Sequence, residues 1–183
     1  MEARPRILLV CTANVCRSPM GAGMLRSRLA DLGVCADVES AGLLESGSPV
    51  AGRAVRLLAA RGVDIAGHFS RRLDAEIIGR ATFVVGMEPR HAQEAALVAP
   101  DAWPKTFVLE ELVRRSEAIG PRTTEPLEAW RGRLHLGRSP EDLLRAGDGV
   151  PDPFGRSDDA YRDTIEVLDR LLGRFADLAW RRA

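Results

Sequence analysis

The sequence predicts an α/β protein, a three-layer αβα sandwich in which helices cover both faces of a central four-stranded parallel sheet. Four short runs suited to strands alternate along the chain with segments of helical periodicity. Such alternation indicates βαβ units and therefore a parallel sheet. The chain has 183 residues, and because domains commonly contain about 100–200 residues, we expect residues 1–183 to form a single domain.

The first half of the sheet comes from two short runs. Residues 7–10 are a continuous apolar run, typical of a strand buried on both faces, and residues 37–40 are the second candidate strand. Between them lies a helical pattern that Gly33 is placed to end. Its apolar residues recur every three or four positions: Met20, Met24, Leu25, Leu29 and Leu32.

The second half of the sheet continues the alternation. Residues 50–61 are the next expected helix, 81–87 the third strand, 89–98 a further helix and 105–109 the fourth strand. We find no internal repeat and no low-complexity linker in the sequence.

The last helix, expected at residues 158–180, carries the strongest pattern. Ser157 is placed as its N-cap, and Asp158 and Asp159 favour the positive end of the helix dipole. The residues of its apolar stripe recur every three or four positions: Tyr161, Ile165, Leu168, Leu171, Leu172, Phe175 and Leu178.

Residues 114–149 are unusually long for a connection between two elements. They hold seven arginines against six acidic residues, so they do not form a basic arm. Leu127, Trp130 and Leu134 fall on one helical face. We therefore expect a helical lid or insertion here, placed before the loop that contains Asp152 and able to cap a cleft.

The charge balance excludes several classes of partner. Twenty-six basic residues oppose 26 acidic ones, so the formal net charge is zero. A protein that binds nucleic acid or an anionic membrane surface usually shows a basic excess. We expect neither partner, and the sequence leaves the oligomeric state open.

The cysteines and the amino terminus indicate a compartment. Cys11, Cys16 and Cys35 are the three cysteines, an odd number that does not suit a disulfide scaffold. The apolar run at 7–10 is too short for a signal peptide, and no window approaches the roughly 20 apolar residues of a membrane span. We expect a soluble cytoplasmic protein with reduced thiols, and we expect Cys35 to lie in the core.

The segment CTANVCRSP at residues 11–19 carries the candidate chemistry. It leaves a buried strand and enters a helix, so successive backbone N–H groups and the positive helix end are able to surround an oxyanion. That field favours the thiolate form of Cys11, a nucleophile. Arg17 supplies a planar fork for two phosphate oxygens. The loop residues expected around the phosphate are Thr12, Ala13, Asn14, Val15, Cys16 and Arg17.

This segment resembles the phosphate-binding loop of the low-molecular-weight protein tyrosine phosphatases, whose signature is Cys, five residues, then Arg-Ser. Three further elements resemble the family in the expected order: Ser40-Ala41-Gly42, His68-Phe69-Ser70-Arg71 and Asp152-Pro153-Phe154-Gly155. The likeness covers about residues 6–113 and 150–178. It implies a flavodoxin- or Rossmann-like sandwich of the phosphotyrosine phosphatase I type.

The resemblance implies a two-step mechanism on a phosphorylated protein. Cys11 attacks phosphorus and forms a cysteinyl-phosphate while Arg17 and the loop N–H groups hold the oxygens. Asp152 protonates the leaving oxygen and then activates water. Ser18 hydrogen-bonds the Cys11 sulfur. The family requires no cofactor and no metal, and phosphate or another oxyanion is the expected ligand.

The resemblance also assigns supporting roles. Asn14 would hold the loop in a positive-φ conformation, which Asn tolerates, and Ser40 and His68 would orient it. Cys16 would form a reversible disulfide with Cys11 and protect the nucleophile from further oxidation.

Several functions remain open within this resemblance. Phosphotyrosine hydrolysis is the first hypothesis, because Val15 stands where phosphoarginine phosphatases carry threonine. The Phe154-Gly155 pair resembles those phosphoarginine enzymes and favours the second hypothesis. Thiol-dependent arsenate reduction is the third, but residues 80–113 hold no cysteine to relay electrons. A pure phosphate-binding module would need neither Cys11 nor Asp152.

Overall fold

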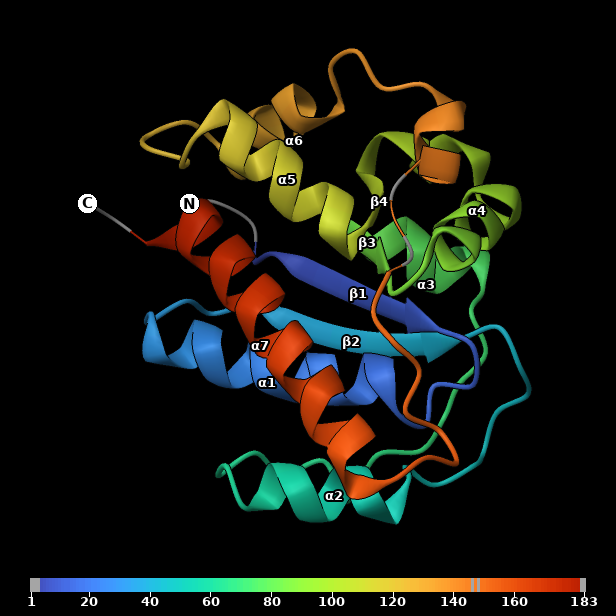
Figure 1. Cartoon of the computed structure of the whole chain (residues 1–183). Coiled ribbons are helices and arrows are strands. Elements are labelled where there is room, and N and C mark those ends of the chain that lie inside the picture. The colour runs from blue at the N-terminus through green and yellow to red at the C-terminus, as the bar shows by residue number, and fades with distance from the viewer. Residues whose placement is uncertain (1–3, 146, 148, 182–183) are drawn as a thin grey trace.

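A computed structural model describes residues 4–145, 147 and 149–181 of the chain. Its four strands form one parallel sheet in the order β2-β1-β3-β4 (Figure 1). The strands are β1 (Arg6–Cys11), β2 (Asp37–Gly42), β3 (Phe83–Gly86) and β4 (Thr106–Val108). The α/β sandwich with a four-stranded parallel sheet is therefore confirmed.

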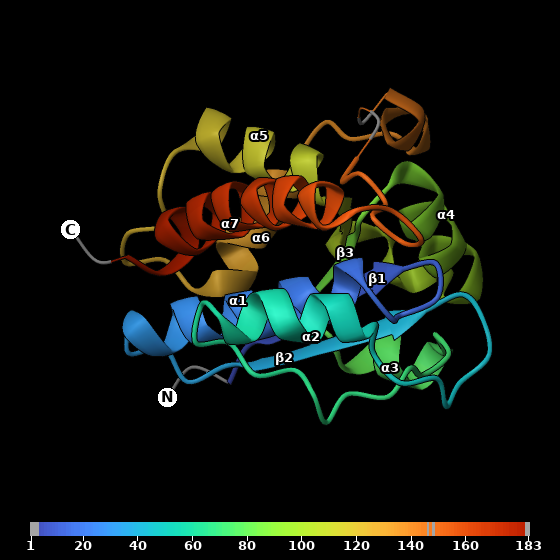
Figure 2. The same cartoon turned by 60° about the horizontal axis from the view of Figure 1, so that its bottom comes forward.

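One face of the sheet is covered by the helices α1 (Arg17–Asp31), α5 (Leu109–Ile119) and α7 (Asp158–Trp180), and α7 packs against both of the others. In Figures 1 and 2, α7 crosses this face beside α1. Alternate strand residues, among them Ile7 and Leu9, enter the same apolar cluster as these helices.

The opposite face is covered by α3 (Ala75–Arg80) and α4 (Pro89–Val98). Leu8 and Val10, which alternate with Ile7 and Leu9 along β1, are buried in a second cluster on that side. Because both faces of β1 are covered, the uninterrupted apolar run that predicted this strand has a direct physical explanation.

The expected elements occur with small differences in their bounds. The structure has α4 and α7 at the predicted residues, and Ser157 caps α7 by accepting a hydrogen bond from the Ala160 N–H. The helix α2 (Gly52–Ala59) is shorter than expected. The helices α3 and α5 were not predicted. Residues 62–80 were assigned no element, and α5 begins at the end of the expected fourth strand and continues into the expected insertion.

The 114–149 segment begins inside α5 rather than after it. It continues through α6 (Leu127–His135), in which Leu127, Trp130 and Leu134 are buried as their spacing predicted. Arg131 donates to the Thr82 carbonyl, just before β3 begins, so α6 lies at the end of the sheet away from the 12–16 loop. The expectation that this helix caps the cleft is wrong.

A buried arginine fixes the next part of that segment. The Arg138 guanidinium donates to the Glu111 carboxylate at 2.7 and 3.1 Å and to the Thr106 carbonyl at 2.8 Å. Its carbon lies 4.1 Å from the ring centres of both Trp103 and Phe107. Full pairing is what allows a charge to remain buried. The chain that leads toward Asp152 is thus attached to α5 and β4.

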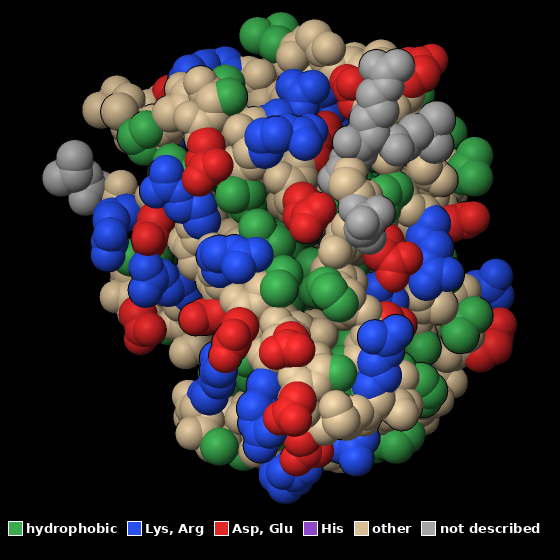
Figure 3. Space-filling view, viewed as in Figure 1, with side chains coloured by type: hydrophobic (Ala, Val, Ile, Leu, Met, Phe, Trp, Pro, Cys, Tyr) green, Lys and Arg blue, Asp and Glu red, His purple; other side chains and the backbone are tan. Residues whose placement is uncertain are grey.

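Two features of the surface concern Cys35 and the distribution of charge. Cys35 is exposed, so its assignment to the core is wrong. It lies in the short connection between α1 and β2. Acidic and basic side chains are interspersed on the face shown in Figure 3, in agreement with the balanced composition. Within the described residues, no helix has the length and apolarity needed to cross a membrane.

Candidate active site

The loop formed by residues 12–16 lies at the carboxyl edge of the sheet, between β1 and α1. In the strand order β2-β1-β3-β4, β2 lies on one side of β1 and the later strands lie on the other side. Ligands of open α/β sheets bind at such a switch point in the strand order. The N-cap of α1, Cys16, makes no capping hydrogen bond with its side chain, so this side chain does not occupy the first N–H groups of the helix, which are able to bind an anion.

Cys11 ends β1, and its side chain is almost fully buried. Its Sγ lies 3.0 Å from the Ser18 Oγ, the hydrogen-bond distance expected for this pair. Ser18 is fully buried in the first turn of α1. A hydroxyl at this position is able to donate to a thiolate, and it offers the sulfur a stabilising partner when a bond to sulfur breaks.

Asn14 holds the loop in shape. Its φ is 55°, a strained value that costs on the order of 1 kcal/mol. The side-chain amide donates to Ser18 and Ser40 at 2.9 Å each, and its oxygen accepts from the Arg71 N–H at 3.0 Å. The His68 Nε2 lies 2.9 Å from the Asn14 carbonyl and must donate to it. These bonds offset the strain. Ser40 and His68 both contact Asn14, as the resemblance implies.

The Arg17 guanidinium donates hydrogen bonds to four groups of the site. The Arg17 side chain is 1% exposed. One guanidinium nitrogen, Nη1, donates to the Glu88 carboxylate and, at 3.1 Å, to the Val150 carbonyl. The other, Nη2, donates to Asp152 Oδ2 at 2.7 Å and to Thr12 Oγ1 at 3.3 Å. The structure thus brings together Arg17 and Asp152, which are 135 residues apart in the sequence.

Glu88 is a site residue that the sequence reasoning missed. It precedes α4, and its second carboxylate oxygen accepts from Arg90 at 2.8 Å. Burial is the largest single cause acting on the Glu88 carboxyl, and it opposes ionisation. The hydrogen bond and charge of Arg17, together with the charges of its other basic neighbours, outweigh burial, so the pKa of Glu88 is lower than usual. Its position at the carboxyl end of β3 is the one signal that would have indicated it.

His91 was also missed. Its Nδ1 accepts from the Glu88 N–H at 3.0 Å, and its Nε2 lies 3.0 Å from Thr12 Oγ1. Burial is the main cause that lowers the pKa of His91 to about 4, and the neighbouring Arg17 charge adds to it. The ring is therefore neutral near pH 7.

The Asp152 loop is attached to the end of β3 by its own backbone. The Val150 N–H donates to the Met87 carbonyl at 2.8 Å. Gly149 has φ of 80°, and a Cβ there would lie 2.3 Å from the same carbonyl oxygen, so only glycine fits. Asp152 itself is exposed, and its Oδ1 accepts from the Phe154 N–H at 3.2 Å. A carboxylate in this position is able to reach a ligand and solvent.

Cys16 is buried, and its Sγ lies 3.2 Å from the Tyr161 hydroxyl, a partner that the sequence reasoning had placed in the core of α7. Burial raises the pKa of Cys16 to about 11, although the hydrogen bond from Tyr161 acts in the opposite direction. Cys16 is therefore a thiol near pH 7.

Three large apolar side chains are exposed on the loops near the carboxyl edge of the sheet: Leu44, Phe69 and Phe154. The bridge between Pro49 and Phe69 places an aromatic residue beside the 43–50 segment, which itself contains none. Phe154 follows Asp152 closely in the chain. These side chains offer apolar contact to a substrate bound near the loop.

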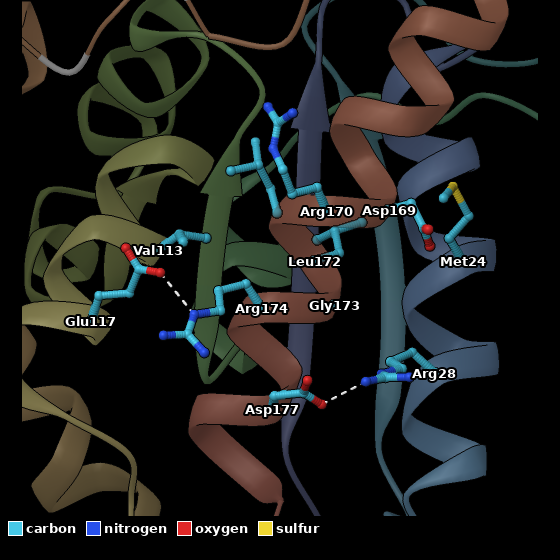
Figure 4. Close-up of a pocket in the computed structure, with 11 residues that line it drawn as sticks. Met24, Arg28, Val113, Glu117, Asp169, Arg170, Leu172, Gly173, Arg174 and Asp177 are labelled. Atoms are coloured by element: carbon cyan, nitrogen blue, oxygen red, sulfur yellow. Dashed lines mark hydrogen bonds and ion pairs between the residues drawn. The ribbon is translucent and has the colours of Figure 1, made fainter.

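A separate pocket of about 540 Å³ lies between α1, α5 and α7 (Figure 4). Ion pairs of 2.7 Å join Arg28 to Asp177 and Arg174 to Glu117 at its sides. None of its 11 lining residues belongs to the candidate site. Among the described residues, no three His, Cys, Asp or Glu side chains are grouped to hold a metal ion.

Comparisons with known proteins agree with this geometry. A family model described as low molecular weight phosphotyrosine protein phosphatase matches residues 6–132. The chain is 28% identical over 173 residues to the low molecular weight protein-tyrosine-phosphatase Etp of Escherichia coli K12, covering 93% of this chain and 91% of that protein. It is 32% identical over 173 residues to a protein-arginine-phosphatase of Geobacillus stearothermophilus, covering 94% of each.

Solved structures show the same relationship. The crystal structure of a low molecular weight protein tyrosine phosphatase from T. tengcongensis matches with a TM-score of 0.74 and 27% identity, covering 94% of this chain and 98% of that one. A YwlE mutant from Bacillus subtilis matches with a TM-score of 0.72 and 29% identity, covering 94% and 97% respectively.

Proposed function

Because the chain belongs to the low molecular weight phosphotyrosine protein phosphatase family, we propose that it hydrolyses phosphotyrosine in proteins through a cysteinyl-phosphate intermediate. The observation that carries this proposal is the convergence of Cys11, Ser18, Arg17 and Asp152 at one edge of the sheet. A nucleophile, an anion clamp and a proton donor are the groups that the reaction needs.

In the first step, the Cys11 thiolate attacks phosphorus and the bond from phosphorus to the tyrosyl oxygen breaks. The Asp152 carboxylic acid gives its proton to that oxygen, which leaves as a phenol. Arg17 holds two phosphoryl oxygens, and the loop N–H groups hold the third as charge redistributes. In the free protein Asp152 is paired with Arg17 Nη2, so the bound phosphoryl group takes over that nitrogen.

In the second step, water attacks the cysteinyl-phosphate and Asp152 accepts its proton. The bond between sulfur and phosphorus breaks, and Ser18, 3.0 Å from Cys11 Sγ, hydrogen-bonds the departing thiolate. Inorganic phosphate then leaves. Glu88 acts as a positioning residue, because its ion pair with Arg17 fixes the direction of the guanidinium. We place this activity in the cytoplasm, where Cys11 stays reduced.

Turnover of an aryl phosphate tests the proposal. The protein should release phenolate in the presence of a chelator, and Cys11→Ser should abolish turnover while retaining phosphate binding. Ser18→Ala serves as a graded control that slows the second step more than the first. Full activity of the Cys11→Ser variant would disprove the mechanism.

Phosphoarginine hydrolysis is the second candidate, and it uses the same groups. It is favoured by the likeness to the Geobacillus protein-arginine-phosphatase, at 32% identity, and by the exposed Phe154 beside Asp152. Val15 favours phosphotyrosine, since it carries no hydroxyl. Parallel values of kcat/KM for phosphotyrosine and phosphoarginine peptides decide between them, and the Val15→Thr variant should shift the ratio toward phosphoarginine.

A further inference from the structure

The Thr12 hydroxyl lies among three hydrogen-bond donors. Its oxygen accepts from Arg90 Nη2 at 2.7 Å, from His91 Nε2 at 3.0 Å and from Arg17 Nη2 at 3.3 Å. The direction of the His91 bond is fixed, because the Glu88 N–H donates to the other ring nitrogen, Nδ1. In a neutral ring whose Nδ1 accepts, Nε2 carries the proton and donates it.

None of these three neighbours is able to accept the hydroxyl proton of Thr12. A guanidinium has five donors and no acceptor, which excludes Arg17 and Arg90. His91 uses its one lone pair on the Glu88 N–H, and its low pKa keeps it neutral with Nε2 protonated. These donors occupy the lone pairs of the Thr12 oxygen. Its own O–H therefore has to point toward an acceptor other than Arg17, Arg90 and His91.

The position of the hydroxyl indicates which acceptor this is. The Arg17 nitrogen next to Thr12 also donates to Asp152 Oδ2 at 2.7 Å. Thr12 Oγ1 and the Asp152 carboxylate therefore flank the same nitrogen. An oxygen that binds to this nitrogen in place of Asp152 lies beside the Thr12 hydroxyl.

We propose that the Thr12 side chain donates a hydrogen bond to the phosphoryl oxygen held by Arg17 Nη2, and that Arg90 and His91 are positioning residues that direct its proton. This inference rests on the proposed phosphatase function and adds a substrate contact to it. The backbone N–H groups of the loop point in fixed directions. The hydroxyl instead turns about its C–O bond, and the two positioning residues restrict it to one direction.

The bond strengthens as negative charge grows on that oxygen. A hydrogen bond to a charged group contributes more than one between neutral groups. Removal of one donor from an oxyanion site lowers kcat by roughly a hundred- to a thousandfold in enzymes. We expect a loss at or below the lower end, because Arg17 and the loop N–H groups remain.

The Thr12→Val and Thr12→Ser variants form a matched pair. Valine keeps the shape of threonine without its hydroxyl, whereas serine keeps the hydroxyl without the methyl group. With an aryl phosphate as substrate, T12V should lower kcat/KM by about ten- to a hundredfold, and T12S should restore it to within about threefold of the wild type. Unchanged kcat/KM in T12V, or an equal loss in T12S, would overturn the inference.

Binding of orthophosphate, measured by calorimetry, separates this inference from the proposed function. If the wild type shows no turnover, the proposed function fails, and phosphate affinity still decides the role of Thr12. T12V should then bind phosphate at least about fivefold more weakly than T12S, and equal affinities would overturn the contact.

A double-mutant cycle tests the positioning role of Arg90. The loss caused by Arg90→Met should be smaller in the T12V protein than in the wild type, because the contact through Thr12 is already gone. Equal losses in both proteins would show that Arg90 does not act through Thr12.

Discussion

Arg17 connects two carboxylates that have different surroundings. Glu88 is partly buried and its pKa is lowered by the arginine, so it remains an anion that holds the guanidinium. Asp152 is exposed at the other side of the fork. In the proposed mechanism, the partly buried carboxylate fixes the direction of the guanidinium, while the exposed one exchanges protons with the substrate and with water.

Asp152→Asn should lower kcat most for substrates whose leaving group has a high pKa. A weakly acidic phenol or alcohol needs a proton from Asp152, so its kcat should fall by about 10²–10⁴-fold. A dinitrophenolate leaves without a proton and should lose much less. A series of aryl phosphates of graded phenol pKa measures this. Equal losses across the series would show that Asp152 is not the general acid.

Cys16 is a slow resolving thiol if it forms the proposed disulfide with Cys11. Peroxide oxidises Cys11 to a sulfenic acid. The Cys16 thiolate then attacks the Cys11 sulfur, the S–S bond forms as the S–O bond breaks, and the departing hydroxide takes a proton from solvent. Because burial raises the pKa of Cys16 to about 11, the thiolate fraction grows about tenfold per pH unit below that value. After a short peroxide pulse and a pH jump, the rate of disulfide formation should rise in the same way between pH 7 and 9.

Two variants control the redox measurement. Cys16→Ser should form no internal disulfide. Tyr161→Phe should slow disulfide formation at a given pH, because the Tyr161 hydrogen bond lowers the pKa of Cys16. A rate that does not change with pH, or a faster Y161F protein, would contradict this description.

At the scale of elements, the site is made by two loops that meet at the start of α4. The 12–16 loop is held from one side by Asn14 and its partners. The loop before Asp152 is held by the Val150 hydrogen bond to Met87 and by the contact of Val150 with Arg17. The anchor at Arg138 adds a second attachment to the chain that leads there.

Gly149→Ala should displace the Asp152 loop. A non-glycine residue at φ of 80° costs about 1–2 kcal/mol, and the clash of its Cβ with the Met87 carbonyl adds to that cost. We expect a loss of about 2–4 kcal/mol in the free energy of unfolding, together with reduced kcat. Urea titration and aryl phosphate turnover measure the two effects.

Gly173→Ala is the matched control. Gly173 lies inside α7, and a Cβ there meets nothing within 4 Å. Alanine in a helix interior is better than glycine by about 0.5–1 kcal/mol, so this variant should be more stable. If G149A were as stable as the wild type, the close contact between Gly149 and the Met87 carbonyl would not require glycine at position 149.

At the scale of the whole molecule, the histidines lower the free energy of unfolding as the pH falls. All three have a pKa below the usual value, mainly because of burial. The unfolded chain therefore binds more protons than the folded one at pH values just below about 6.5. Stability should fall as the pH falls through this range.

His91 should contribute most of this change. Its pKa is about 4 in the folded protein against 6.5 in the unfolded chain, which corresponds to about 3 kcal/mol by pH 4. Urea titrations at pH 7, 6, 5 and 4.5 should show a smaller loss of stability for His91→Asn than for the wild type. If the free energy of unfolding fell equally with pH in the two proteins, His91 would not be the residue responsible.

The sequence by itself determined the elements with a strong period and the residues of the loop. A fully apolar run predicts β1, and the three-to-four-residue period predicts α7, because burial imposes those patterns on the chain itself. Cys11 and Arg17 are recognisable since they lie within one local motif. Asp152 was indicated by its family resemblance, although it lies 135 residues from its partner.

The tertiary structure decided the contacts between distant segments and the exposure of isolated residues. Glu88, His91 and Tyr161 reach the site across 71 to 145 residues of sequence, and no local pattern marks an acid or a ring as a partner of a particular loop. Cys35 was assigned to the core but is exposed, because burial of a single side chain depends on what packs over it. Local periodicity is set by backbone geometry, whereas proximity is set by how the layers pack.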